Sequence, residues 1–263
     1  MNSLVKITRY ELNDVLRSKW VILYGLFFYL LTDILFRFGG SSSKVILSLM
    51  NVVLIIIPLM SVVFGVMYLY NAREFIEMML SQPINRKSLF GGLFTGLALP
   101  LSLGFAAGVG IPFAIHGLEN ASHLGILIML LISGIFLTII FVNLAFLISI
   151  VHEDKIMGLG IALLNWLLFS VVYDGIVLLV TYLFADYPLE KAVIGLTILN
   201  PIDLARILIM LKFDIAALMG YTGAVFEQFF GSYLGLLISF VSLTVWAVVP
   251  FLLGLRAFSR KDF

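Results

Sequence analysis

Six long apolar stretches make up most of the chain; short segments separate the first five, and a longer one precedes the sixth. They are Trp20–Phe38, Val45–Tyr70, Leu89–Ile115, Leu124–Val151, Ile156–Phe184 and Tyr233–Leu255. A helix needs about 20 mostly apolar residues to cross a bilayer, and each stretch is about that long or longer. Strands of a membrane barrel alternate apolar and polar residues, whereas these stretches are apolar at odd and even positions alike. The pattern predicts an all-α integral membrane protein with six transmembrane helices.

The N-terminal segment, residues 1–19, has a different pattern. Its apolar residues fall on one helical face, and its charged residues lie mostly on the other face. The apolar face consists of Leu4, Ile7, Leu12, Val15 and Leu16. A helix with one apolar and one charged face lies in the membrane interface rather than across it. We therefore expect an interfacial helix that leads into the first span.

The segment between the last two spans, residues 185–232, is too apolar for a flexible linker. Within it, Asn200 is predicted to cap a short helix that begins at Pro201. The apolar stripe of this helix consists of Leu204, Ile207, Leu208 and Leu211. We expect one or two short helices in this outer segment. The chain has no domain boundary, so residues 1–263 are predicted to form a single membrane domain.

Lysine and arginine are distributed unevenly between the two sides that six spans define. Eleven lie at the chain ends and in the two loops on the same side, and five lie on the other side. Cytoplasmic segments of membrane proteins carry an excess of lysine and arginine. The distribution predicts a multi-pass protein of the bacterial inner membrane. Both termini and residues 71–88 are then cytoplasmic, and residues 185–232 are periplasmic.

Composition agrees with a membrane protein and excludes several functions. Hydrophobic residues make up 62% of the chain and charged residues 12%, against about 25% charged in soluble domains. The net charge of +1 gives no indication of nucleic-acid binding, and the chain has no cysteine for thiolate sites. It contains no G-x-x-x-x-G-K-[ST] or H-E-x-x-H sequence. The histidines, His116, His123 and His152, fall in or near loops and are expected to be solvated. We expect no catalytic residue, metal or cofactor in this chain.

Asp174 is the one carboxylate well inside a predicted span. Charged residues within the membrane are rare and often functional, so Asp174 is a candidate for a proton or cation relay. A relay usually needs several such groups, and the spans offer Asp174 no evident partner. A structural hydrogen bond or a polar cavity is the alternative. Asp33 and Arg37 are four residues apart and are predicted to pair on one helix.

A short polar helix is predicted at Ala72–Ser81, between the second and third spans. Pro83 ends it, and Ser88 is expected to cap the span that follows. The candidate contact residues in and after this helix are Arg73, Glu74, Phe75, Glu77, Met78, Arg86 and Lys87. One interpretation is an ordinary loop anchored at the interface. The functional interpretation is a projection that a soluble partner grips.

A helix, acidic residues, a proline and a basic residue in this order, between spans two and three, resemble the ABC-2 type permease family. In that family two membrane subunits pair with two separate ATPases, and this segment is the coupling helix that enters a cleft on the ATPase. The amphipathic N-terminal helix is similar to the family's elbow helix. The resemblance implies a second permease copy and two ATPase subunits, which bind ATP and Mg.

A narrower resemblance rests on three segments together: "KITRYELNDVLRSKW", "REFIEMMLSQPINRKSLFGG" and "LNPIDLARIL". They are similar to permeases of this family that support maturation of the copper enzyme nitrous oxide reductase. This implies a periplasmic solenoid-like partner, and the candidate contacts are Asn200, Pro201, Asp203 and Arg206. The alternatives are a permease that exports lipid, drug or polysaccharide, an ion-coupled secondary carrier that uses Asp174, and a membrane anchor for an assembly complex.

Overall fold

The computed structural model of the chain describes residues 15, 18–39, 42–116, 121–184, 190–211 and 233–261. Within these ranges every regular element is a helix, and six helices are long and apolar enough to cross a membrane. They are α2 (Lys19–Gly39), α3 (Ser42–Asn71), α5 (Arg86–His116), α6 (Ala121–Val151), a fifth span in three consecutive pieces, and α12 (Tyr233–Arg260). The fifth span consists of α7 (Lys155–Leu167), the π-helix η1 (Leu168–Val172) and α8 (Tyr173–Leu183). The predicted all-α fold with six spans is confirmed.

Three shorter helices complete the described part of the chain: α4 (Arg73–Leu80), α9 (Glu190–Leu199) and α10 (Pro201–Leu211). The chain bends by 111° between α9 and α10, so these two helices do not form one straight span. They are the short helices expected between the last two spans. The N-terminal helix predicted within residues 1–19 lies mostly outside the described residues and stays a prediction.

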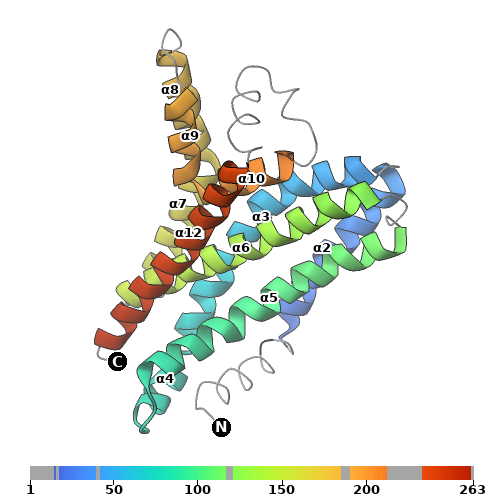
Figure 1. Cartoon of the computed structure of the whole chain (residues 1–263). Coiled ribbons are helices and arrows are strands. Elements are labelled where there is room, and N and C mark those ends of the chain that lie inside the picture. Colours follow the sequence, from blue (N-terminus) through green and yellow to red (C-terminus); the bar gives the residue numbers. More distant parts are fainter. Residues whose placement is uncertain are drawn as a thin grey trace.

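α6 lies at the centre of the bundle. The helices α3, α5 and α12 pack along it, α10 packs against it, and α2 lies along α5 (Figure 1). The helix α4 and the C-terminal end of the chain lie together at the bottom left of Figure 1, and we call this the α4 end. The opposite side, which holds α9 and α10, is the α10 end. Each end is therefore built from segments that are far apart in the sequence.

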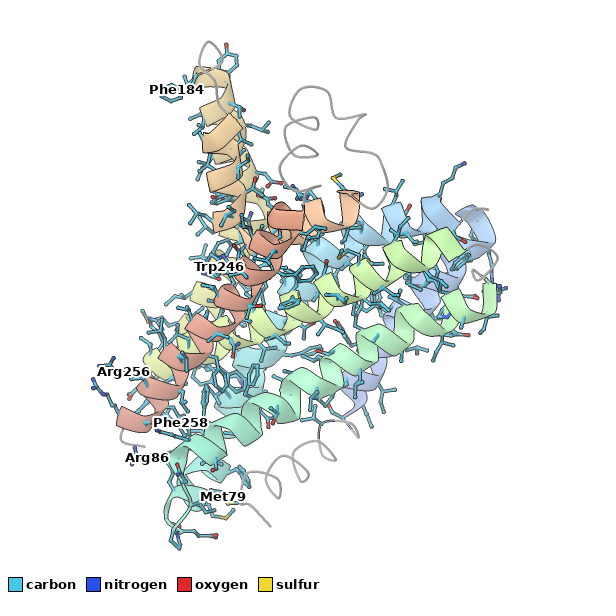
Figure 2. All side chains as sticks on the ribbon, viewed as in Figure 1. Met79, Arg86, Phe184, Trp246, Arg256 and Phe258 are labelled. Atoms are coloured by element: carbon cyan, nitrogen blue, oxygen red, sulfur yellow. The ribbon has the colours of Figure 1, made fainter. Side chains whose placement is uncertain are left out.

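Aromatic rings fill the space between three spans near the α4 end. The ring of Phe90 on α5 lies 5.9 Å from Phe146 on α6, and 5.4 and 5.5 Å from Phe251 and Phe258 on α12. Figure 2 shows Phe258 beside Arg86 at this end. Tilted and edge-on ring pairs at these distances are favourable and specific in geometry. The cluster fixes the spacing of α5, α6 and α12.

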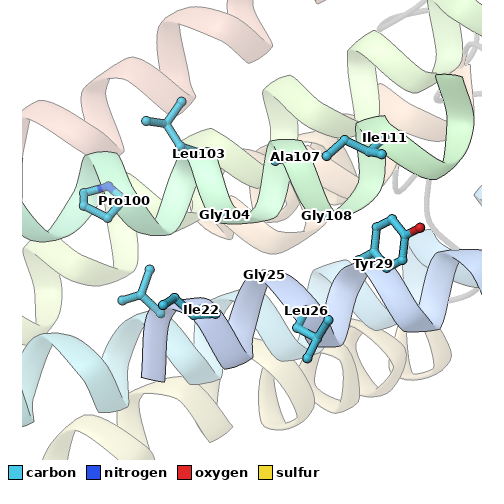
Figure 3. A pocket seen from close by; sticks show the side chains of 11 residues that line it. Ile22, Gly25, Leu26, Tyr29, Pro100, Leu103, Gly104, Ala107, Gly108 and Ile111 are labelled. Atoms are coloured by element: carbon cyan, nitrogen blue, oxygen red, sulfur yellow. The ribbon is translucent and has the colours of Figure 1, made fainter. Parts of the chain in front are cut away.

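The contact between α2 and α5 depends on small residues. A Cβ atom on Gly108 would lie 2.6 Å from the carbonyl oxygen of Gly25, so a larger residue does not fit without moving the helices. Close backbone approach through glycine is a common way to pack helices in membranes. Beside this contact, α2 and α5 border an open groove of about 450 Å³ (Figure 3). None of the described residues that line the groove is charged, which is typical of a surface that faces lipid chains.

Candidate functional sites at the two ends of the bundle

The predicted polar helix between spans two and three is α4, Arg73–Leu80, within one residue of the expected bounds at each end. Ile76 is its anchor, because only 1% of this residue is exposed. The side chains of Glu74 and Glu77 are exposed, and Met78 is 53% exposed. One face of α4 thus packs on the bundle, and the other presents two carboxylates and a methionine to the surroundings.

The base of α4 is bound to the turn between α6 and α7. The Tyr70 hydroxyl, at the end of α3, donates toward the carbonyl oxygens of His152 at 2.7 Å and Asp154 at 3.0 Å. Arg73 donates to the carbonyl of Glu153 at 3.4 Å. The Asp154 carboxylate in turn caps α7 by accepting hydrogen bonds from the backbone N–H groups of Ile156 and Met157 in the first turn of that helix. The base of α4 is therefore bonded to the turn that leads into span five.

Arg86, one of the predicted partner contacts, binds the end of α12 through its guanidinium, and its contact with a partner stays a prediction. Its Nη1 donates to the carbonyls of Lys261 at 2.7 Å and Ser259 at 3.2 Å. The last carbonyls of a helix have no partner within that helix, and a cation is well suited to them. Lys261 itself donates to the carbonyl of Ile150 at the end of α6, at 2.7 Å. These bonds join the ends of α6 and α12 to the start of α5.

The expected cap at Ser88 is wrong, because α5 begins at Arg86. The Asn85 side-chain oxygen accepts a hydrogen bond from the backbone N–H of Lys87 at 2.9 Å, so Asn85 is the cap. Asparagine is a strong N-cap residue, and it lies three positions before the serine. Unlike Arg86, Lys87 is exposed and remains available at this end.

Replacing Arg86 with methionine is expected to lower the free energy of unfolding by about 1–3 kcal/mol, because two carbonyls at the end of α12 lose a charged donor. Thermal unfolding of the purified protein in detergent measures this as a lower midpoint. Lys87→Met is the matched control, since it removes a neighbouring exposed charge, and it should unfold like the wild type. Equal midpoints for the two variants would contradict the role assigned to Arg86.

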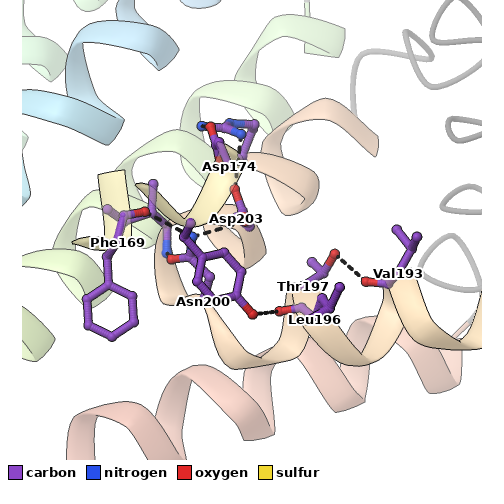
Figure 4. Close-up of polar contacts among 10 residues, drawn as sticks. Phe169, Asp174, Val193, Leu196, Thr197, Asn200 and Asp203 are labelled. Carbon is purple, nitrogen blue, oxygen red and sulfur yellow. Dashed lines mark hydrogen bonds and ion pairs between the residues drawn. The ribbon is translucent and has the colours of Figure 1, made fainter. Parts of the chain in front are cut away.

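At the α10 end, span five is interrupted by the π-helix η1, and the corner between α9 and α10 is docked against it (Figure 4). The Asn200 side-chain amide donates to the carbonyl of Phe169, inside η1, at 3.0 Å. The Tyr173 hydroxyl donates to the carbonyl of Leu196 at 2.6 Å. From α12, the Trp246 ring N–H donates to the carbonyl of Ile198 at 3.4 Å. The α9–α10 corner is therefore held by spans five and six.

Asp174 has a charged partner, contrary to expectation. Arg206 on α10 places Nη2 3.1 Å from a carboxylate oxygen of Asp174 and Nη1 3.0 Å from one of Asp203. Asn200 donates to the other oxygen of Asp203 at 3.0 Å. Burial raises the pKa of Asp203, which lies outside the six spans, to about 6; the Arg206 charge opposes this rise, and the Asp174 charge adds to it. Span five and α10 are thus joined by a cluster of two carboxylates and one guanidinium.

The residues expected to contact a periplasmic partner are mostly turned inward. Asn200, Pro201 and Asp203 are buried within the chain, so these side chains do not form an exposed surface, and their contact with a partner stays a prediction. Asn200 does cap α10 as predicted, because its Oδ1 accepts the N–H of Ile202 at 3.0 Å. Of the four candidates, Arg206 is the one that keeps a partly exposed side chain.

The apolar stripe of α10 explains this burial. Leu204, Ile207 and Leu208 are buried as predicted, whereas the side chain of Leu211 lies outside the described residues. The stripe faces the bundle because α10 packs on α6 and α3. Burying the stripe brings Asp203, on the same short helix, into the interior, where Asn200 donates to one carboxylate oxygen and the Arg206 charge lies 3.0 Å from the other.

Asn200→Asp is expected to destabilise the protein by about 1–3 kcal/mol, although aspartate is an equally good cap. The change keeps the capping oxygen but removes the donors to Phe169 and Asp203, and it adds a carboxylate beside Asp203. Asn85→Asp is the matched control, because Asn85 uses its side-chain oxygen as a cap and is exposed. Thermal unfolding should separate the two variants. If both behave alike, Asn200 acts as a cap alone.

A third polar contact lies between α2 and the end of α5. The predicted pair of Asp33 and Arg37 is present at 2.8 Å. His116 ends α5 with an exposed side chain, as expected, and its Nε2 lies 3.2 Å from Asp33. His152 lies in the turn after α6, with Nδ1 3.1 Å from the carbonyl of Ile148, and the side chain of His123 is outside the described residues. Asp33 therefore joins two spans at the end away from α4.

Comparison with known proteins identifies the family. Residues 5–263 match the family described as ABC-2 family transporter protein. The chain belongs to the ABC-2 transporter family. As an ABC-2 permease it is a multi-pass component of membrane transport, and permeases of this kind work with ATPase partners.

Two curated relatives of this ABC-2 permease have the same description, "Probable ABC transporter permease protein NosY". One, from Pseudomonas aeruginosa, is 28% identical over 230 residues, which cover 81% of this chain and 84% of the relative. The other, from Stutzerimonas stutzeri, is 25% identical over 288 aligned positions, which cover 99% of each chain. The similarity extends over the whole bundle and includes both ends described above.

Proposed function

We propose that this ABC-2 permease is the membrane subunit of an ATP-driven transporter that supports maturation of the copper sites of nitrous oxide reductase. The resemblance of its three quoted segments and its similarity to two NosY permeases along most of their length support this assignment. The permease is not an enzyme in this proposal. ATP and Mg bind to the partner ATPase, and the chain itself holds no cofactor.

One observation carries the coupling role. The α4 helix presents Glu74, Glu77 and Met78 on an exposed face, while Ile76 and the bonds of Tyr70 and Arg73 fix its base to the bundle. An exposed helix on a fixed base is suited to enter a cleft on a partner and to transmit its movement. Phe75 and Lys87 complete the proposed contact surface, whereas Arg86 supports it by holding the end of α12.

Motion at α4 has a continuous route to the other side of the bundle. The turn that binds Tyr70 and Arg73 leads directly into α7, and the fifth span then passes through η1 to α8. Asp174 at the start of α8 holds Arg206 of α10. We infer that the route ends at the α9–α10 corner, which acts on the outer partner. π-Helices inside longer helices frequently occur at functional sites.

The proposed assembly contains two permease copies, two ATPases on the cytoplasmic side and a solenoid-like partner on the periplasmic side. The proposed outer contacts are Asn200, Pro201, Asp203 and Arg206, of which Arg206 has a partly exposed side chain. Asn200, Pro201 and Asp203 shape the corner from within. The ATPases and the outer partner therefore act on opposite ends of the same helices.

This orientation has a direct test, because the chain has no cysteine of its own. Single cysteines are placed at Ser81, beside α4, and at Lys44, near the start of α3; both residues are exposed. Intact cells are treated with a membrane-impermeant thiol reagent, and lysed cells serve as the positive control. Lys44→Cys should react in intact cells and Ser81→Cys only after lysis, since Lys and Arg favour the cytoplasm at the α4 end. The reverse result would invert the proposed topology.

The coupling role predicts a loss of ATPase binding when the charge of α4 is reversed. The double variant Glu74→Lys and Glu77→Lys should copurify with at most about a tenth of the wild-type ATPase, because like charges or lost pairs across an interface cost more than about 1.4 kcal/mol. Maturation of nitrous oxide reductase, measured as copper content of the enzyme in a complemented deletion strain, should fall in parallel.

The neutral double variant Glu74→Gln and Glu77→Gln is the graded control and should lose less ATPase than the reversed one. Thermal unfolding should match the wild type in both variants, because the two side chains lie on the exposed face. Full ATPase retention by the lysine variant would remove α4 from the interface. Lost ATPase binding with normal copper content would instead favour another cargo, such as a lipid, drug or polysaccharide.

A further inference from the structure

A groove of about 390 Å³ lies at the α4 end of the bundle, where the start of α2 and the last turns of α3 meet α5. This volume is at the lower end of the range for small-molecule sites. Among the residues of α3 that line it, Val63 is farthest from the helix end at Asn71, so the groove follows α3 for about 12 Å at 1.5 Å per residue. The apolar walls include Val15, Val21, Val63, Phe64, Met67 and Leu97.

Two polar side chains, Ser18 and Asn71, line the mouth of the groove, which is its end next to α4. Ser18 directly precedes α2, and Asn71 is the last residue of α3. The side-chain oxygen of Asn71 accepts a hydrogen bond from Lys155 Nζ at 3.1 Å. Within the described part of the chain, neither the amide N–H groups of Asn71 nor the hydroxyl of Ser18 donates a hydrogen bond. The mouth therefore offers unused donors.

Lys155 adds a positive charge to the mouth. It begins α7, its side chain is exposed, and one of its three N–H donors is directed to Asn71. The two carboxylates that precede it in the chain have other roles, since Asp154 caps α7 and Glu153 lies 3.8 Å from Lys261. None of the described residues that line the groove is acidic. Among the described residues, Lys155 thus has no carboxylate partner.

These features define the kind of ligand that fits. Apolar walls that end at unused donors and a cation suit a molecule with an anionic, acceptor-rich head and a hydrocarbon tail. Lysine is a common phosphate ligand, because phosphate oxygens accept charge-assisted hydrogen bonds. Trp20, 67% exposed at the edge of the groove, is a residue typical of the boundary between hydrocarbon and water. The groove therefore lies at the depth where the head of a phospholipid meets its chains.

We propose that this groove binds an anionic phospholipid of the membrane, with the phosphate at Lys155, Asn71 and Ser18 and one acyl chain along Val63 and Met67. A zwitterionic head fits less well, because it brings a second cation to a mouth without a carboxylate. The site is built from this chain alone and goes beyond the proposed transport role. Its test needs neither the ATPase nor nitrous oxide reductase.

The test measures how closely each lipid approaches Trp20. Trp166→Phe and Trp246→Phe leave Trp20 as the only tryptophan, and the purified protein is placed in phosphatidylcholine bilayers that contain phosphatidylglycerol. Bromine atoms on the acyl chains of one lipid at a time quench a nearby tryptophan. Brominated phosphatidylglycerol should quench Trp20 at about a fifth of the mole fraction that brominated phosphatidylcholine needs, because one lysine at a membrane surface favours anionic lipid about fivefold.

Lys155→Gln should abolish this preference, and Lys155→Arg should keep it, because arginine retains the charge. Asn71→Asp should also abolish it, since the new carboxylate pairs with Lys155; the position is exposed, so the fold tolerates the change. Arg256→Gln is the matched control. It removes an exposed cation of α12 at the same end of the bundle, away from the groove, and should leave the preference unchanged (Figure 2).

Lipid titrations followed by mass spectrometry of the chain with all three tryptophans give a second measurement, in which the same order of variants is expected. An equal loss of preference in Lys155→Gln and Arg256→Gln would show a general attraction of anionic lipid to the basic end and would overturn the proposal. Unchanged preference in Lys155→Gln would also overturn it. Displacement of brominated phosphatidylglycerol by inorganic phosphate would show a site for free anions and would contradict a lipid site.

Discussion

The backbone of a membrane protein must find its hydrogen bonds inside the protein, because hydrocarbon offers none. This constraint explains why the described chain is built from long helices. It also explains why side chains form hydrogen bonds to the backbone mainly where a helix ends or is irregular. A helix leaves carbonyls unpaired at its end, and a π-helix changes their pairing within a span. Arg86 binds carbonyls at the end of α12, Lys261 one at the end of α6, and Asn200 one inside η1. The same bonds that satisfy the backbone hold separate helices together.

The two ends of the bundle meet this constraint differently. At the α4 end, Tyr70, Arg73 and Arg86 donate to backbone carbonyls, and Lys261 forms an ion pair with Glu153, so that end is joined mostly through main-chain acceptors. At the α10 end, Arg206 lies between two carboxylates from different helices. Arg206 and Asp174 are partly exposed, whereas Asp203 is buried, so removing Arg206 would leave the Asp203 charge uncompensated in the interior. The α10 end therefore fixes the position of span five relative to α10 through charge as well as through hydrogen bonds.

Burial changes how the polar residues of α10 are interpreted. Polar residues in an otherwise apolar helix suggest a contact surface, yet Asn200 and Asp203 are buried and bonded within the chain. The corner between α9 and α10 needs these two side chains, because the chain bends by 111° there. The bend leaves the first N–H groups of α10 without partners in a preceding turn, and the corner packs against the π-helix of span five. Arg206 has both properties, since it pairs with Asp174 inside the cluster and keeps a partly exposed side chain.

The sequence by itself determined the six spans, the helix at α4 and the start of α10, because these depend on local apolar length, Pro83 and the Asn200–Pro201 pair. It also determined the pair of Asp33 and Arg37, which are neighbours on one helix. Only the tertiary structure decided the partners that are distant in sequence: Arg206 for Asp174, 32 residues away, and the end of α12 for Arg86, more than 170 residues away. No local pattern encodes such pairs, because they exist only after α10 has packed on α6 and α12 has returned to the start of α5.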